Sequence, residues 1–125
     1  MLDIVKHITI NDKEYPIAFT MNVMEAIQDK YGSMKEWGDI LQPPEGEEPK
    51  IKDLKWTFMQ FINEGIDIEN EEKNEKRAFL TEKQVGRLIS IVGMDKINAK
   101  MMSVTSESMK TENPNEMTTQ NQTNQ

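Results

Sequence analysis

Side chains able to do chemistry are few in this chain, and their spacing does not group them. The only histidine of the 125 residues is His7, and there is no cysteine. The alternating acids Asp67, Glu69 and Glu71 resemble the start of a calcium-binding loop, but the glycine of loop position six and the glutamate of position twelve are missing. Because catalysis needs several titratable groups that converge, we expect no enzyme activity, no cofactor and no metal site.

The charge balance limits the partners that this chain can bind. Asp and Glu number 22 against 15 Lys and Arg, which gives a formal net charge of −7. Such a protein repels phosphate backbones and anionic lipid surfaces, so we expect neither a nucleic acid nor a membrane partner. No apolar run approaches the roughly 20 residues that span a bilayer, and no secretory signal is visible. We therefore expect the protein to be located in a cytoplasm.

Period-two alternation predicts a β-hairpin over residues 4–19. Its expected apolar face consists of Ile8, Ile10, Tyr15, Ile17 and Phe19, with a polar turn at residues 11–14. Pro16 predicts an edge strand or an outward-facing backbone nitrogen. Since two strands alone are marginal in water, the hairpin must pack on a helix or on another chain.

Helix signals follow the hairpin at regular intervals. Pairs with the spacing of capping boxes occur at Asn22/Glu25, Ser33/Glu36 and Thr81/Gln84, and Asp53 and Asp95 are further candidate N-caps. Residues 53–65 carry the densest apolar stripe, which predicts the centre of the core, whereas residues 66–80 read as a solvated linker or an exposed helix.

These patterns predict an α+β fold, mostly helical, with an N-terminal β-hairpin, four to five helices and a disordered C-terminal tail. The expected domain covers residues 1–105. The expected disordered tail covers residues 106–125, because its polar composition buries too little apolar area to offset the entropy of ordering.

Two features near the C-terminus suggest contacts with other molecules. The helices expected within residues 81–105 meet near Gly93 as a helix-turn-helix would, so a small DNA-binding regulator is one alternative. Met94, Met101 and Met102 form a cluster that either fills gaps in the core or offers an adaptable protein-binding surface.

The order of the segments resembles the tail assembly chaperones of tailed bacteriophages. Four segments carry the resemblance, and they are Ile8-Thr-Ile-Asn-Asp-Lys-Glu-Tyr-Pro-Ile-Ala-Phe19, Lys30-Tyr-Gly32, Asn63-Glu-Gly65 and Leu80-Thr-Glu-Lys-Gln-Val-Gly-Arg-Leu-Ile89. The family shows similar "I-x-I-x-G-K-E-Y-x-I-x-F", "K-Y-G", "N-E-G" and "L-T-x-E-x-V-G-x-L-I" patterns in the same order. The resemblance spans about residues 4–105 and departs at Asp12, where many relatives have glycine.

This resemblance implies a non-enzymatic protein of phage tail morphogenesis. Such chaperones bind the tape-measure protein, keep it soluble in the host cytoplasm while tail-tube protein polymerises around it, and are normally absent from the virion. Many also exist as a longer form made by programmed frameshifting. The expected partner-binding residues are the five on the hairpin face together with Met94, Met101 and Met102, and self-association is also expected to be possible. A structural component retained in the virion is a second alternative.

Overall fold

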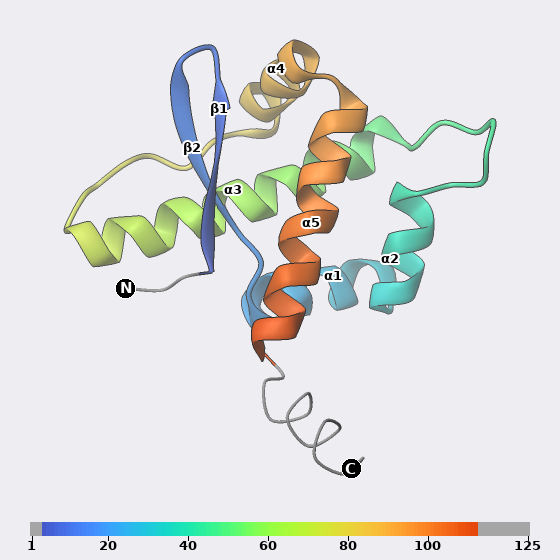
Figure 1. Ribbon diagram of the computed structural model, residues 1–125, viewed down its shortest axis with the longest axis horizontal. Coiled ribbons are helices and arrows are strands. Elements are labelled where there is room, and N and C mark those ends of the chain that lie inside the picture. The colour runs from blue at the N-terminus through green and yellow to red at the C-terminus, as the bar shows by residue number, and fades with distance from the viewer. Residues whose placement is uncertain (1–3, 113–125) are drawn as a thin grey trace, which may run out of the picture.

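The computed structural model describes residues 4–112 and shows a two-stranded antiparallel hairpin followed by five helices (Figure 1). This arrangement confirms the predicted α+β, mostly helical class. The elements are β1 (Val5–Ile10), β2 (Lys13–Ala18), α1 (Met21–Tyr31), α2 (Met34–Leu41), α3 (Ile51–Lys73), α4 (Glu82–Val92) and α5 (Met94–Glu112). None of the helices within the described range is long and apolar enough to cross a membrane.

The hairpin closes through a two-residue turn. Asn11 and Asp12 have φ values of 52° and 66°, the pair of left-handed conformations that defines a type I′ turn. The register therefore pairs Ile10 with Lys13 and continues to Val5 and Ala18. Asn and Asp tolerate these conformations, so the turn forms without the glycine common in the resembled family.

The hairpin is covered on both faces, whereas its sequence pattern predicted one apolar face. The four residues from Tyr15 to Ala18 in β2 are all buried, although successive strand residues point to opposite sides. One face lies on α3, where Pro16 meets Gly65. The opposite face lies towards α4, because Tyr15 and Leu88 border one groove and Ile8 and Val92 border another.

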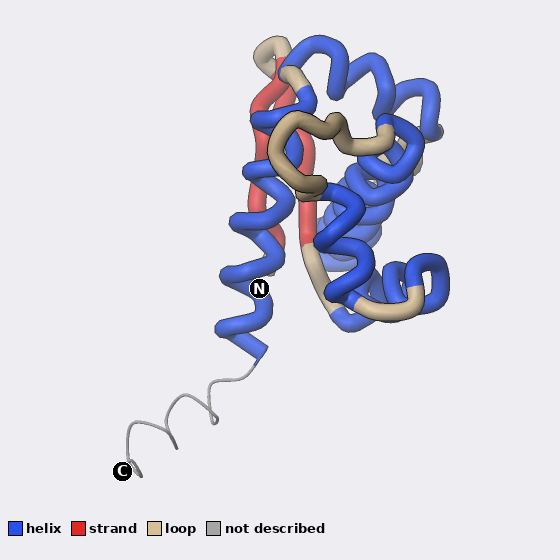
Figure 2. Tube along the Cα trace, turned by 90° about the vertical axis from the view of Figure 1, so that its right-hand side faces the viewer, coloured by secondary structure: helices blue, strands red, loops and turns tan. Residues whose placement is uncertain are grey.

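Helix α3 forms the centre of the core, as its apolar stripe predicts. Its fully buried apolar side chains are Leu54, Phe58, Phe61, Ile62 and Ile66. The ring of Phe61 lies 5.7 Å from that of Phe19, which follows β2. In the tube view α5, the helix that leads to the C-terminus, lies beside the two strands (Figure 2).

The predicted helix starts are confirmed in two places and wrong in three. Ser33 caps α2 and the Thr81/Gln84 capping box opens α4. Helix α1 is capped by Thr20 instead of Asn22, because the Thr20 hydroxyl accepts hydrogen bonds from the first-turn amides. Helix α3 begins before Asp53, and α5 begins at Met94, directly after Gly93.

The charged segment 66–80 divides into a helical and an extended part. Helix α3 continues to Lys73, and the following chain runs back along it. Two asparagine side chains of α3 hold this return: Asn63 bonds the backbone N–H and C=O of Leu80, and Asn70 does the same for Arg77. These two side-chain amides therefore form hydrogen bonds with the backbone of the connection, as a neighbouring strand would.

The predicted disordered tail begins too early, because α5 continues through residues 106–112. The buried positions Ile97, Met101, Val104 and Ser108 follow one another at helical spacing and continue the inner face of the helix. Since the last of these is a serine, the apolar pattern ends before the helix does. The rest of the predicted tail, residues 113–125, lies outside the described residues.

Candidate functional site

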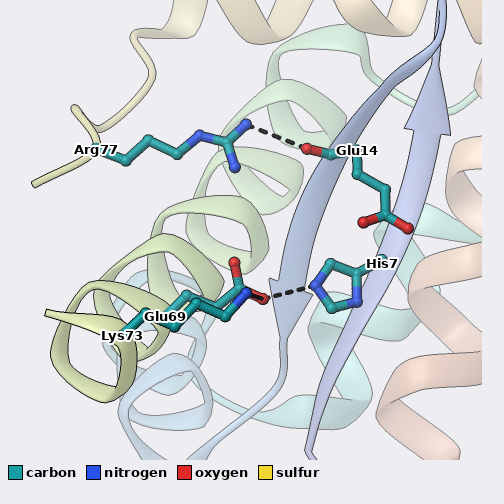
Figure 3. Close-up of polar contacts among 5 residues, drawn as sticks. All are labelled: His7, Glu14, Glu69, Lys73 and Arg77. Carbon is teal, nitrogen blue, oxygen red and sulfur yellow. Dashed lines mark hydrogen bonds and ion pairs between the residues drawn. The ribbon is translucent and has the colours of Figure 1, made fainter. Parts of the chain in front are cut away.

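The only histidine lies in a polar contact between the hairpin and α3 (Figure 3). His7 Nε2 lies 2.6 Å from Glu69 Oε2, and Lys73 Nζ lies 3.5 Å from the same oxygen. Nearby, the Arg77 guanidinium donates a 3.2 Å hydrogen bond to the backbone carbonyl of Glu14 and stacks over the Tyr15 ring. These contacts join β1 and β2 to α3 and to the connection that follows it.

The electrostatics of this cluster fit a structural contact. Burial of the Glu69 carboxyl raises its pKa, but the hydrogen bond and charge of His7, together with the charge of Lys73, outweigh burial and hold the pKa below its usual range. The carboxylate therefore stays ionised and bonded to the hairpin. Neither His7 nor Glu69 lines the four grooves described below.

Most of the predicted hairpin binding face is buried in the protein itself. Ile10, Tyr15, Ile17 and Phe19 are at most 9% exposed, and only Ile8 is half-buried. A partner would have to displace other parts of the protein to reach Ile17 and Phe19, which are at most 1% exposed. Ile17 and Phe19 belong to the core cluster, whereas Ile10 and Tyr15 line grooves, so contact of a partner with this face stays a prediction.

The methionine cluster divides in the same way. Met101 is fully buried within the core, whereas Met94 and Met102 are half-buried and pack at its border. Met94 also lines a groove beside α4. Of the eight predicted partner-binding residues, Ile8, Met94 and Met102 are half-buried, and the buried Ile10 and Tyr15 still line grooves.

Sequence reasoning missed the large apolar side chains that are most exposed. Among the described residues these are Met21, Ile51, Phe79, Ile91 and Met109. Ile91 is 52% exposed. Helical spacing alone could have identified it, because α4 buries Val85 and Ile89 on one stripe and Ile91 lies off that stripe.

Three grooves border helix α4. The first lies between β1, the end of α4 and α5, the second between β2 and α4, and the third between the start of α3 and the α4–α5 junction. Their apolar lining is largely aliphatic and includes Ile8, Leu88, Ile89 and Met94. We call these three grooves and the exposed Ile91 the α4 surface.

The charge of the α4 surface is opposite to that of the whole protein. Five basic side chains line the three grooves, with no aspartate or glutamate among the described lining residues, and they are Lys13, Lys55, Arg87, Lys96 and Lys100. A fourth groove, between α1 and α3, is instead lined by Glu64 and Asp67 beside the exposed Phe79. Apolar grooves bordered by cations suit a segment that combines apolar and acidic side chains.

No group of three or more metal-ligating side chains occurs within residues 4–112. Tests against known proteins do not assign the site either, since no family model, curated protein or solved structure matches this chain.

Proposed function

We propose that this protein is a non-enzymatic assembly chaperone that holds segments of a client protein on the α4 surface. The observation that carries the proposal is the α4 surface itself: open grooves with apolar lining and five cations in a protein of net charge −7. Such grooves bind apolar side chains of a client, while the acidic remainder of the protein keeps the complex soluble.

The client that we propose is the tape-measure protein of a tailed phage. The ordered segments from Ile8 to Ile89 that resemble tail assembly chaperones support this identification. A tape-measure protein is long and helical, and its apolar stripes need cover until tail-tube protein surrounds it. Recruitment of tail-tube protein, and a role in the host cytoplasm followed by release before the virion is complete, belong to the same proposal.

An affinity pull-down tests this function. The tagged protein is recovered from cells that produce the phage, and its partners are identified by mass spectrometry, with an unrelated tagged protein of similar acidity as the control. Recovery of the tape-measure protein supports the proposal. Recovery of the protein alone contradicts it, and detection of the protein in purified virions favours a structural tail component.

A second candidate is a DNA-binding regulator, which the same five cations favour. Helices α4 and α5 meet at Gly93, and Lys96 and Lys100 lie near the start of α5. However, one side of α5 packs in the core through Ile97, Met101 and Val104, so that side cannot contact DNA. Duplex binding that weakens steeply between low and moderate salt would support this candidate, because phosphate contacts release counterions.

A further inference from the structure

The first groove of the α4 surface exposes the edge of a β-strand. Four consecutive residues, 8–11 of β1 and its turn, line this groove of about 410 Å³. Successive strand residues point to opposite faces, so a groove that contacts all of them must run along the strand's backbone edge. Within the described residues the sheet has two strands, and β2 occupies the other edge of β1.

The register identifies which backbone groups face outward. In a type I′ hairpin the residues flanking the turn, Ile10 and Lys13, form a hydrogen-bonded pair. Along the ladder, non-hydrogen-bonded and hydrogen-bonded pairs then alternate. Ile8 therefore bonds to β2, while the N–H and C=O of Thr9 point into the groove. No hydrogen bond between described residues satisfies these two groups.

The opposite wall of the groove carries apolar and basic side chains. Ile91 and Val92 come from α4, and Lys96 and Lys100 from α5. In both views α5 lies beside the hairpin (Figures 1 and 2), and Lys6 of β1 meets Glu107 of α5 at 3.8 Å beyond the groove. Neither Lys96 nor Lys100 forms an ion pair with a carboxylate among the described residues.

We propose that this groove binds an extended acidic segment of a client, which adds to β1 as a third strand. The proposal rests on the proposed chaperone function in that it assigns the segment to the client. The outward groups of Thr9 bond the segment's backbone, and alternate carboxylates meet Lys96 and Lys100. Lysines four apart on a helix lie about 6 Å apart along its axis, and alternate strand residues lie about 6.6 Å apart, so the spacings match.

A peptide fits these features better than a nucleic acid does. The edge presents both a donor and an acceptor at Thr9, as a partner strand requires, whereas a phosphate backbone is repelled by the carbonyl oxygen. Ile91 and Val92 also offer apolar area that a phosphate cannot use. Binding of a DNA duplex in this groove is therefore the alternative that the following test distinguishes.

The probe is a fluorescein-labelled peptide that alternates glutamate and valine, compared with a block peptide of the same composition. Fluorescence anisotropy gives its affinity for the full chain, and amide NMR shifts locate it. We expect the alternating peptide to bind and to perturb the Thr9 amide, and the block peptide to bind at least tenfold more weakly. Equal binding of the two peptides, no binding, or efficient competition by a DNA duplex would overturn the proposal.

Two pairs of variants separate the edge from general charge. Thr9→Pro removes the outward donor, whereas Thr9→Val keeps it. Lys96→Glu with Lys100→Glu reverses the charge of the groove, whereas Lys50→Glu with Lys76→Glu makes the same change at exposed positions elsewhere. We expect about tenfold loss of peptide binding from the first member of each pair and little from the second. The lysine variants keep the test decisive if Thr9→Pro prevents folding.

Failure of this inference differs from failure of the chaperone function. If the Lys96/Lys100 variant still recovers the tape-measure protein at the yield of the unmodified chain, the client binds elsewhere and the strand-addition site is wrong. If the unmodified chain recovers no tape-measure protein, the proposed function is wrong.

Discussion

Gly65 of α3 lies directly against the backbone of Pro16 in β2. A β-carbon at Gly65 would stand 2.6 Å from the carbonyl carbon and oxygen of Pro16 and 2.8 Å from the nitrogen of Ile17. These are backbone atoms that cannot turn aside as a side chain can. Because Gly65 has no side chain, the hairpin packs closely against α3. This close packing explains why a central helix carries a glycine despite its cost in helix propensity.

Gly65→Ala is expected to destabilise the fold by on the order of 2–3 kcal/mol, because overpacking forces the hairpin away from α3. Gly38→Ala in α2 is the matched control, since no atom lies within 4 Å of its β-carbon position. That control is expected to gain about 0.5–1 kcal/mol from helix propensity. Urea unfolding followed by circular dichroism measures both. Equal effects of the two substitutions would contradict the close approach.

Local patterns predicted the elements well and their surroundings less well. The hairpin and the Thr81/Gln84 box depend on neighbouring residues, and each is confirmed. Asn22 failed as a cap because its side chain instead donates to Glu64, more than 40 residues away. Such a contact depends on tertiary packing and leaves no local signal.

The candidate site was harder to predict, for a related reason. The apolar face of the hairpin looked available because its cover, α4 and α5, lies more than 60 residues later in the sequence. Apolar periodicity identifies which side chains are buried, but it does not identify the element that they pack against. Ile91 could be found by its place off the stripe of α4, whereas the grouping of Lys13, Lys55 and Lys96 around one helix needed the fold.

The buried hydrogen bond from Trp37 Nε1 to Thr57 Oγ1, 3.1 Å long, joins α2 to α3. Thr57→Val keeps the shape but leaves the indole N–H unsatisfied, so we expect a loss of about 1–3 kcal/mol in the free energy of unfolding. Thr105→Val is the control, because the Thr105 hydroxyl is buried and has no partner among the described residues. We expect that control to be neutral or stabilising. Denaturation monitored by tryptophan fluorescence would reveal an unimportant bond if both variants unfolded alike.

The contact of Glu69 with His7 and Lys73 predicts a stability that depends on pH. The pKa of Glu69 is lower in the folded chain than its usual value of about 4.5, so its ionised form stabilises the fold above that pH. This stabilisation is lost as the pH falls through the lower, folded pKa. Glu69→Gln should therefore cost about 1–2 kcal/mol at pH 5.5 and progressively less as the pH falls through the folded pKa of Glu69.

Thermal unfolding of both chains across this pH range measures the difference. Glu71→Gln is the control, because its side chain is exposed on the same helix. We expect the stability of this control to follow that of the unmodified chain. A cost of Glu69→Gln that is constant with pH would show that the carboxylate's charge does not hold the hairpin.

Ile91 provides a test of the α4 surface that does not touch the core. Because its side chain is 52% exposed, Ile91→Glu should change the free energy of unfolding by less than about 0.5 kcal/mol. It places a carboxylate among the grooves, so we expect recovery of the tape-measure protein in the pull-down to fall several-fold. Met21→Glu, at a side chain 56% exposed on α1, is the matched control and should leave recovery unchanged. Equal recovery with both variants would move the client away from α4.

The final turns of α5 can be tested with a single proline. Ser106 is exposed and lies between the buried positions Val104 and Ser108, so its side chain contributes little to packing. Ser106→Pro removes a backbone hydrogen bond inside the helix and places its ring against the carbonyl of Met102, which costs about 3 kcal/mol in a helix interior. Ser106→Ala keeps the backbone hydrogen bond and adds no ring, so it should preserve the helix. We expect backbone chemical shifts of residues 106–112 to lose helical character in the proline variant alone, together with a lower melting temperature. If the shifts of the unmodified chain are already those of a random coil, the disordered tail does begin at residue 106, as the polar composition predicted.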